Sequence, residues 1–239
     1  VFVDSFNMPY SRDAEMMAGG YGDNYYLQLV QNIRKFKYDT VDSGAVENER
    51  QTVDITKGSS EWTAISRVYL DAAGEVIRRN CKSVDPSLVY TDTTNRNDVV
   101  SLKMVNDGEN LYIRVETKSP VTEYKEGDEE WMNVYIATGA SGGWENYNYI
   151  VNRRPNADGT TSVQKLNGTV LEEAGAARYF CQGNYIFYEI PLSALGVTAG
   201  DEIQLKITDN IQNFMDIDDF YVSGEAAPIG RINFAYKIA

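Results

Sequence analysis

The stretch VVSLKMVNDGENLYIRVET, residues 99–117, decides the fold class of this chain. It holds two runs in which every second residue is apolar, and the dipeptide Asp107-Gly108 lies between them. Alternation with a period of two is typical of a strand with one buried face, and Asp-Gly is typical of a tight hairpin turn. The stretch therefore predicts a β-hairpin whose inward-facing residues are Val100, Leu102, Met104, Leu111, Ile113 and Val115.

Similar strand signals recur from residue 53 to the C-terminus, in residues 53–55, 132–136, 147–152, 160–166, 186–190, 203–207 and 232–236. Residues 191–196 are long enough for one helical turn, which Gly196 would end. Many short strands separated by turns are typical of β-sandwiches. We therefore expect a mainly β protein, built as an antiparallel β-sandwich.

One helix is expected near the N-terminus, at about residues 23–38, where Asp23 is suited to cap the first turn. Its apolar face is formed by residues at helical spacing, namely Tyr26, Leu29, Val30, Ile33 and Phe36. Residues 39–51 are polar and lack periodicity. We therefore expect two parts: a strand and helix segment at residues 1–45, and the sandwich at residues 46–239.

Composition argues against several classes of function. The net charge is −13, from 35 acidic and 22 basic residues, which disfavours binding to nucleic acid and to anionic membrane surfaces. The chain has no His, which removes most common acid–base and zinc-site designs. No run approaches 18 apolar residues. We expect no nucleic-acid partner, no membrane insertion and no catalytic residue in this chain.

The two cysteines, Cys81 and Cys181, lie far apart in the sequence and match no metal-binding spacing. Cys181 lies in a strand-like run, so we expect a buried free thiol there. A disulfide between the two is the alternative, because the sequence does not show whether they lie close enough to bond.

Four stretches carry a resemblance to a known family: residues 61–70 (EWTAISRVYL), 107–113 (DGENLYI), 188–196 (YEIPLSALG) and 206–210 (KITDN). In this order they resemble the family 9 carbohydrate-binding modules and the related DOMON-like β-sandwiches, over about residues 45–239. The resemblance implies a non-catalytic sandwich that binds carbohydrate, with Trp62 in its core. Family 9 modules that bind sugar hold it between two Trp rings, and this sequence does not place both of them.

The N-terminal residues carry a second resemblance. Residues 2–7 (FVDSFN) and 20–26 (GYGDNYY) are similar to the end of a barrel domain of glycoside-hydrolase type. Such domains precede this sandwich in large secreted bacterial proteins of polysaccharide utilisation. The resemblance implies that this chain is the C-terminal portion of such a protein, with an adjacent domain in the same polypeptide and an extracytoplasmic location.

The candidate carbohydrate site lies around Trp144, in the glycine-containing run SGGWENY at residues 141–147. An aromatic ring displayed there would suit the apolar C–H face of a pyranose, and nearby polar groups would select its orientation. The alternative is an indole folded back over the sandwich, because large rings are mostly buried. The candidate binding residues are Trp144, Tyr147, Tyr149, Asn152 and Arg153.

A second cluster, of carboxylates and amides, lies at residues 209–219. Its oxygen atoms could suit Ca²⁺, with Asp209, Asp216 and Asp218 as candidate ligands, although the spacing does not fit an EF-hand loop. Such runs more often form turns closed by Asx hydrogen bonds. We expect no metal cofactor, with calcium as the alternative.

Together these features predict a carbohydrate-binding accessory domain of an extracytoplasmic polysaccharide-processing protein, with Trp144 exposed. The rival is a structural spacer that supports a neighbouring glycoside hydrolase domain, and it predicts that Trp144 is covered. A third possibility, an enzyme, predicts hydrolysis of aryl glycosides, which we expect to be absent.

Overall fold

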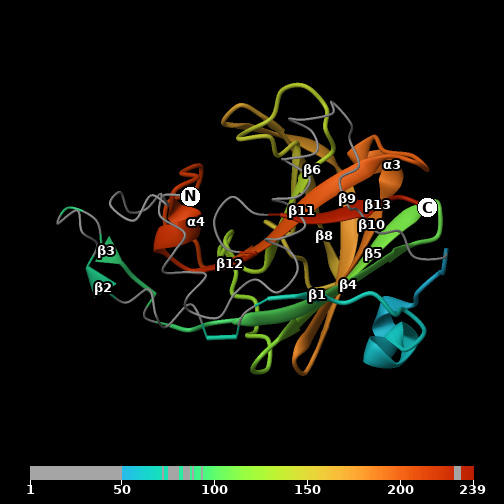
Figure 1. The fold of residues 1–239 in the computed structure, drawn as a ribbon, viewed down its shortest axis with the longest axis horizontal. Helices are drawn as coiled ribbons and strands as arrows, with labels where there is room; N and C mark the ends of the chain where they lie inside the picture. Colours follow the sequence, from blue (N-terminus) through green and yellow to red (C-terminus); the bar gives the residue numbers. More distant parts are fainter. Residues whose placement is uncertain are drawn as a thin grey trace, which may run out of the picture.

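The computed structural model describes residues 50–71, 73, 74, 81, 82, 87, 89–92, 94–228 and 233–239. The helix expected at residues 23–38 and the segment at residues 1–45 lie outside these residues. The protein is mainly β, as expected, and a curled antiparallel sheet dominates it (Figure 1).

Among the described residues, eleven strands form this sheet, in the order β1-β4-β5-β10-β9-β8-β7-β6-β11-β12, with β13 also paired to β11. The strands are β1 (Tyr69–Leu70), β4 (Val99–Asn106), β5 (Asn110–Thr117), β6 (Asn133–Ala137), β7 (Tyr149–Val151), β8 (Thr160–Asn167), β9 (Val170–Gln182), β10 (Tyr185–Pro191), β11 (Glu202–Asp209), β12 (Glu225–Ala227) and β13 (Phe234–Lys237). A separate ribbon joins β2 (Cys81–Lys82) to β3 (Val89–Tyr90). Cys181 lies on β9 as an exposed free thiol, so the expectation that it is buried is wrong.

The helices are short: η1 (Ile55–Trp62), α3 (Leu192–Leu195) and α4 (Asp219–Val222). The helical turn predicted at residues 191–196 is confirmed as α3. Gly196 ends it in the left-handed conformation, at φ 64°, where glycine avoids the steric cost of a side chain. No helix among the described residues has the length and apolar character needed to cross a membrane.

The predicted hairpin at residues 99–117 is confirmed as β4 and β5. Leu102 pairs with Val115, and Gly108 adopts φ 94° in the turn. The register shifts between residues 99 and 101, so Val99 lies in the main core and Val100 is only partly buried. The expected inward position of Val100 is therefore wrong, because a β-bulge reverses the alternation at that point.

The main core lies between the two halves of the curled sheet. One half contributes Val99, Leu102, Met104, Leu111, Ile113, Val115, Ile186, Tyr188 and Ile190, and the other contributes Val134, Ile136, Val151, Ile203, Leu205, Ile207, Phe234 and Tyr236. The two layers are thus opposite halves of one hydrogen-bonded sheet.

Part of the outer face of each half of the sheet is also covered. On one half, Trp62 of η1 is fully buried against Phe187 of β10, with ring centroids 6.1 Å apart, which confirms its expected core position. On the other half, Tyr135, Trp144, Tyr147 and Phe220 form what we call the outer aromatic cluster. The segment that follows β11, residues 210–222, supplies Phe220 and part of this second cover.

We expect Trp62→Ala to destabilise the protein by about 3–5 kcal/mol, because the buried indole joins η1 to the sheet. Leu70→Ala is the control, since Leu70 is 55% exposed and should change the free energy of unfolding by no more than about 0.5 kcal/mol. Urea denaturation measures both. Equal losses for the two variants would contradict the role of η1 as a cover.

Candidate functional site

The structure buries Trp144, so the expected display of its ring is wrong. Only 8% of the residue is exposed. Its ring centroid lies 5.9 Å from those of Tyr135 and Phe220, and 6.2 Å from that of Tyr147, with which it stacks. The indole completes the outer aromatic cluster instead of forming a platform for a ligand.

Local geometry explains this placement. Trp144 and Tyr147 exchange both backbone hydrogen bonds, at 2.9 and 2.8 Å. Between them, Glu145 and Asn146 adopt φ values of 48° and 75°, which are typical of a two-residue hairpin loop. Because side chains directly opposite each other in an antiparallel pair lie on one face, the turn directs Trp144 and Tyr147 together onto the sheet.

Tyr149 and Asn152 do not join this pair. Tyr149 packs in the main core, on the opposite face of the sheet from Trp144. Asn152 is fully buried, and its Nδ2 donates to the backbone oxygens of Trp131 and Met132 at 3.1 and 3.0 Å. The structure therefore does not bring the candidate residues together on one exposed surface.

Arg153 is 4% exposed, and protein groups occupy its guanidinium. It donates to Glu130 Oε1 at 2.7 Å and to Glu129 Oε2 at 2.5 Å, and its guanidinium carbon lies 3.7 Å from the ring centroid of Phe214. Burial raises the pKa of Glu130 to about 7, although Arg153 opposes the shift. Arg153 thus anchors the segment that covers the sheet.

The calcium candidates are not brought together either. Asp209 is fully buried and paired with Arg96, while Asp216 Oδ1 accepts from the backbone N–H of Asp218 at 3.1 Å. Within the described ranges, no group of three or more His, Cys, Asp or Glu side chains could hold a metal ion. Asp219 instead closes the loop, because its Oδ2 accepts hydrogen bonds from the backbone N–H groups of Gln212 and Asn213 at 3.0 Å each.

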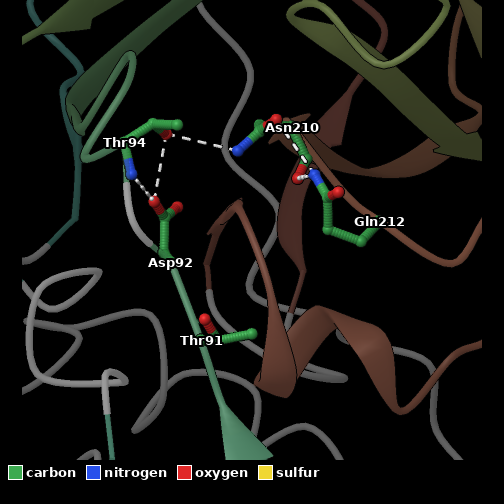
Figure 2. A pocket seen from close by; sticks show the side chains of 5 residues that line it. All are labelled: Thr91, Asp92, Thr94, Asn210 and Gln212. Carbon is green, nitrogen blue, oxygen red and sulfur yellow. Dashed lines mark hydrogen bonds between the residues drawn. The ribbon is translucent and has the colours of Figure 1, made fainter.

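A polar cavity of about 220 Å³ lies beyond the end of β11. One wall follows β3, and the other follows β11. Figure 2 shows the side chains that line it, which are Thr91, Asp92, Thr94, Asn210 and Gln212. Two chain segments far apart in the sequence therefore build this cavity, and we call it the polar cavity.

Hydrogen bonds connect the two walls of the polar cavity. Asp92 Oδ1 accepts from the backbone N–H and the hydroxyl of Thr94, at 2.7 and 3.0 Å. Asn210 Nδ2 donates to the Thr94 hydroxyl at 3.2 Å, and Gln212 Nε2 donates to Asn210 Oδ1 at 3.0 Å, as Figure 2 shows. Within the part of the chain that the structure describes, the Thr91 hydroxyl and Gln212 Oε1 form no hydrogen bond.

An ion pair between half-buried Arg96 and fully buried Asp209 lies beside these walls. Arg96 follows the first wall and donates through Nε and Nη2 to the two carboxylate oxygens of Asp209, at 2.7 and 3.2 Å. Its Nη1 donates to Asp128 Oδ2 at 2.7 Å. Burial raises the pKa of Asp209 to about 6, and Arg96 opposes this shift.

Sequence reasoning found one wall of the cavity and missed the other. Asn210 and Gln212 lie in the cluster at residues 209–219, for which the sequence offers calcium binding as the alternative. Thr91, Asp92 and Thr94 were not considered. The signal that could have found them is the entirely polar run TDTTNRND, residues 91–98, directly before the hairpin.

Comparisons with known proteins identify no family for this chain. No protein-family description matches the sequence, and no curated protein matches it. Among solved structures, the chain is similar to a proposed carbohydrate-binding protein from Bacteroides uniformis. That similarity has a TM-score of 0.28 and 11% sequence identity, and it covers 58% of this chain and 69% of the other.

We expect Trp144→Ala to lower the free energy of unfolding by about 3–5 kcal/mol, because it leaves a cavity among three other rings. Glu145→Ala, in the same turn but exposed, is the matched control and should cost far less. Thermal and urea unfolding measure the difference. If Trp144→Ala were as stable as the control, the indole would not be packed in the cluster, and the expectation of an exposed ring would stand.

Stability should rise as the pH falls from 7.5 to 5. The pKa values of Glu130 and Asp209, about 7 and about 6, lie above their ordinary values of 4.5 and 3.8. Over this range the native state therefore holds protons that the unfolded state has released, and linkage favours the native state at the lower pH. We expect a gain of about 1–3 kcal/mol from these groups.

Urea unfolding at several pH values between 7.5 and 5 measures this gain. Glu130→Gln carries no titratable carboxyl at this position and should reduce the slope. A stability that decreases steadily over the same range would contradict the assignment.

Proposed function

We propose that this chain is a non-catalytic, carbohydrate-binding accessory domain, and that the polar cavity contacts the sugar. The observation that carries the proposal is the lining of this cavity, which consists of hydroxyl, amide and carboxylate groups from two loops. Binding at this cavity replaces the stacking site that was expected at Trp144.

Sugar hydroxyls both donate and accept hydrogen bonds, and so do Thr, Asn and Gln side chains. The Thr91 hydroxyl and Gln212 Oε1 are suited to meet them. A site of about 220 Å³ is smaller than the usual pocket for a drug-sized ligand, so it suits one sugar unit at a time. Without a stacked ring, the affinity should be weak, about millimolar to micromolar.

The electrostatics favour a neutral sugar. Asp92 lines the cavity, none of the described lining residues carries a positive charge, and the chain has a net charge of −13. A uronic acid or a sulfated sugar would meet repulsion at such a site. The preferred ligand is therefore a neutral hexose unit within a glycan.

The wider setting of this domain is a polysaccharide-processing protein located outside the cytoplasm, with a glycoside hydrolase domain adjacent in the same polypeptide. Support for this setting comes from the resemblance of residues 2–7 and 20–26 to the end of a barrel domain of glycoside-hydrolase type. Finding the full reading frame that contains this chain would test the setting directly.

We expect the domain to retain neutral polysaccharides on a glycan array in preference to anionic ones. Gln212→Ala should weaken binding about three- to tenfold, because it removes side-chain hydrogen bonds to the sugar. The backbone N–H of residue 212 would still donate to Asp219, so the loop should keep its shape. Gln182→Ala, an exposed glutamine on β9, is the matched control. Titration calorimetry with the retained glycan measures both variants, and equal affinities would place the site elsewhere.

A structural spacer is the second candidate, and one observation favours it. Trp62, Trp131 and Trp144 are all buried, so none of them presents a ring to a ligand. A spacer would bind neither neutral nor anionic glycans. Deleting it from the parent protein would also lower the melting temperature of the neighbouring domain, which calorimetry would detect.

A further inference from the structure

We propose that Arg96 is a positioning residue that holds the two walls of the polar cavity together through Asp209, and that proton binding to Asp209 releases this hold. The part of this inference that concerns ligand affinity rests on the proposed function. The Arg96–Asp209 ion pair, which we call the clamp, consists of protein groups alone and does not depend on a ligand.

Arg96 is fixed to the first wall at short range. Its backbone N–H donates to the hydroxyl of Thr94 at 3.2 Å, and that hydroxyl lines the cavity. The same hydroxyl donates to Asp92. A change in the position of Arg96 therefore passes directly to two of the lining side chains.

Asp209 is fixed to the second wall in the same way. It is the last residue of β11 and directly precedes Asn210, which lines the cavity. Its Oδ1 accepts from the backbone N–H of Met132 at 3.0 Å, and the backbone N–H of Asn210 donates to the backbone oxygen of Glu130 at 2.7 Å. The second wall is therefore held by groups from the segment before β6.

The geometry of the pair suits a clamp. The two guanidinium nitrogens of Arg96 face the two oxygens of Asp209, and such bidentate pairs fix orientation as well as distance. Asp209 is fully buried, and loss of its charge would remove one of the two carboxylate partners of the Arg96 guanidinium, whose side chain is 19% exposed. Arg96 would then depend on Asp128, which is more exposed than Asp209.

The charged and polar groups around Asp209 come from several elements. Arg96 and Asn97 approach it from the loop before β4, and Asp128 faces it across Arg96. Burial raises the pKa of Asp209 to about 6, against the effects of Arg96, Asn97 and the Met132 N–H. Glu130, with a pKa raised to about 7, is neighboured by Glu129 and Arg153.

Asp209 and Glu130 titrate over one pH range. As the pH falls from 7.5 to 5, Asp209 gains a proton and its bidentate pair with Arg96 weakens. The fold itself gains stability over the same range, because burial penalises the charged carboxylate. Acid should therefore loosen the cavity walls while the sheet stays folded.

The first test needs no ligand. The side-chain amide signals of Asn210 and Gln212 should shift in nuclear magnetic resonance spectra between pH 7.5 and 5, with a midpoint near 6. Asp209→Asn should abolish this titration at every pH. Arg154→Lys, in an exposed ion pair with Glu173, is the control and should leave it unchanged.

Two further variants separate a clamp from general support of the fold. Arg96→Lys keeps the positive charge but lacks the planar guanidinium. The amide signals of Asn210 and Gln212 in this variant should therefore differ from those of the wild type. Asp128→Asn removes a negative charge near Asp209 and should move the midpoint to lower pH. The Asp128 variant also serves if Asp209→Asn fails to fold. Signals of Asn210 and Gln212 that do not change with pH, or an unchanged midpoint in Asp128→Asn, would overturn the clamp.

The second test uses methyl α-glucopyranoside and methyl α-mannopyranoside at pH 7.5 and pH 5. We expect at least threefold weaker binding at pH 5 in the wild type, and no such difference in Asp209→Asn. Binding with equal affinity at both pH values would overturn the link between the clamp and the ligand. Titration of the amides without binding of either glycoside would leave the clamp in place and count against the proposed function.

Discussion

Strands such as β6 and β7 have to be covered on both faces, and this constraint decides where the large aromatic residues lie, whereas β9 is exposed at most positions. Strands β6 and β7 are buried at almost every position, whereas a sheet with one solvated face would show regular alternation. The inner faces cover each other across the main core. The outer faces have no such partner, so η1 and the segment after β11 supply a second layer. Trp62 and Trp144 are used in these outer layers.

The same constraint explains why polar side chains gather at the end of β11. The outer layer at residues 210–222 begins at the end of β11, where apolar cover gives way to a loop. At this boundary, the buried carboxylate of Asp219 organises the loop, and that of Asp209 binds the backbone N–H of Met132 before β6. A buried ion pair adds little net stability, because desolvation offsets the attraction, so the Arg96–Asp209 pair is better understood as fixing geometry.

A cavity of this kind recognises ligands differently from a stacking platform. An aromatic ring contributes contact area, whereas amides and hydroxyls contribute direction and few contacts. The polar cavity would therefore discriminate between sugars but bind each of them weakly. A weak site of this type would act mainly by keeping a neighbouring domain near its polymer, where effective concentration compensates for low affinity.

The sequence by itself determined the β class, the hairpin at residues 99–117, the short helix ended by Gly196 and the core position of Trp62. Most of these depend on alternation and turn chemistry, which neighbours a few residues away control. Only the tertiary structure decided that Val100 lies at a bulge, that Trp144 is covered and that Tyr149 faces the other side of the sheet. It also decided that Arg96 meets Asp209, 113 residues further along the chain. Exposure and long-range pairing depend on which distant segment packs over a residue, and no local pattern records that choice.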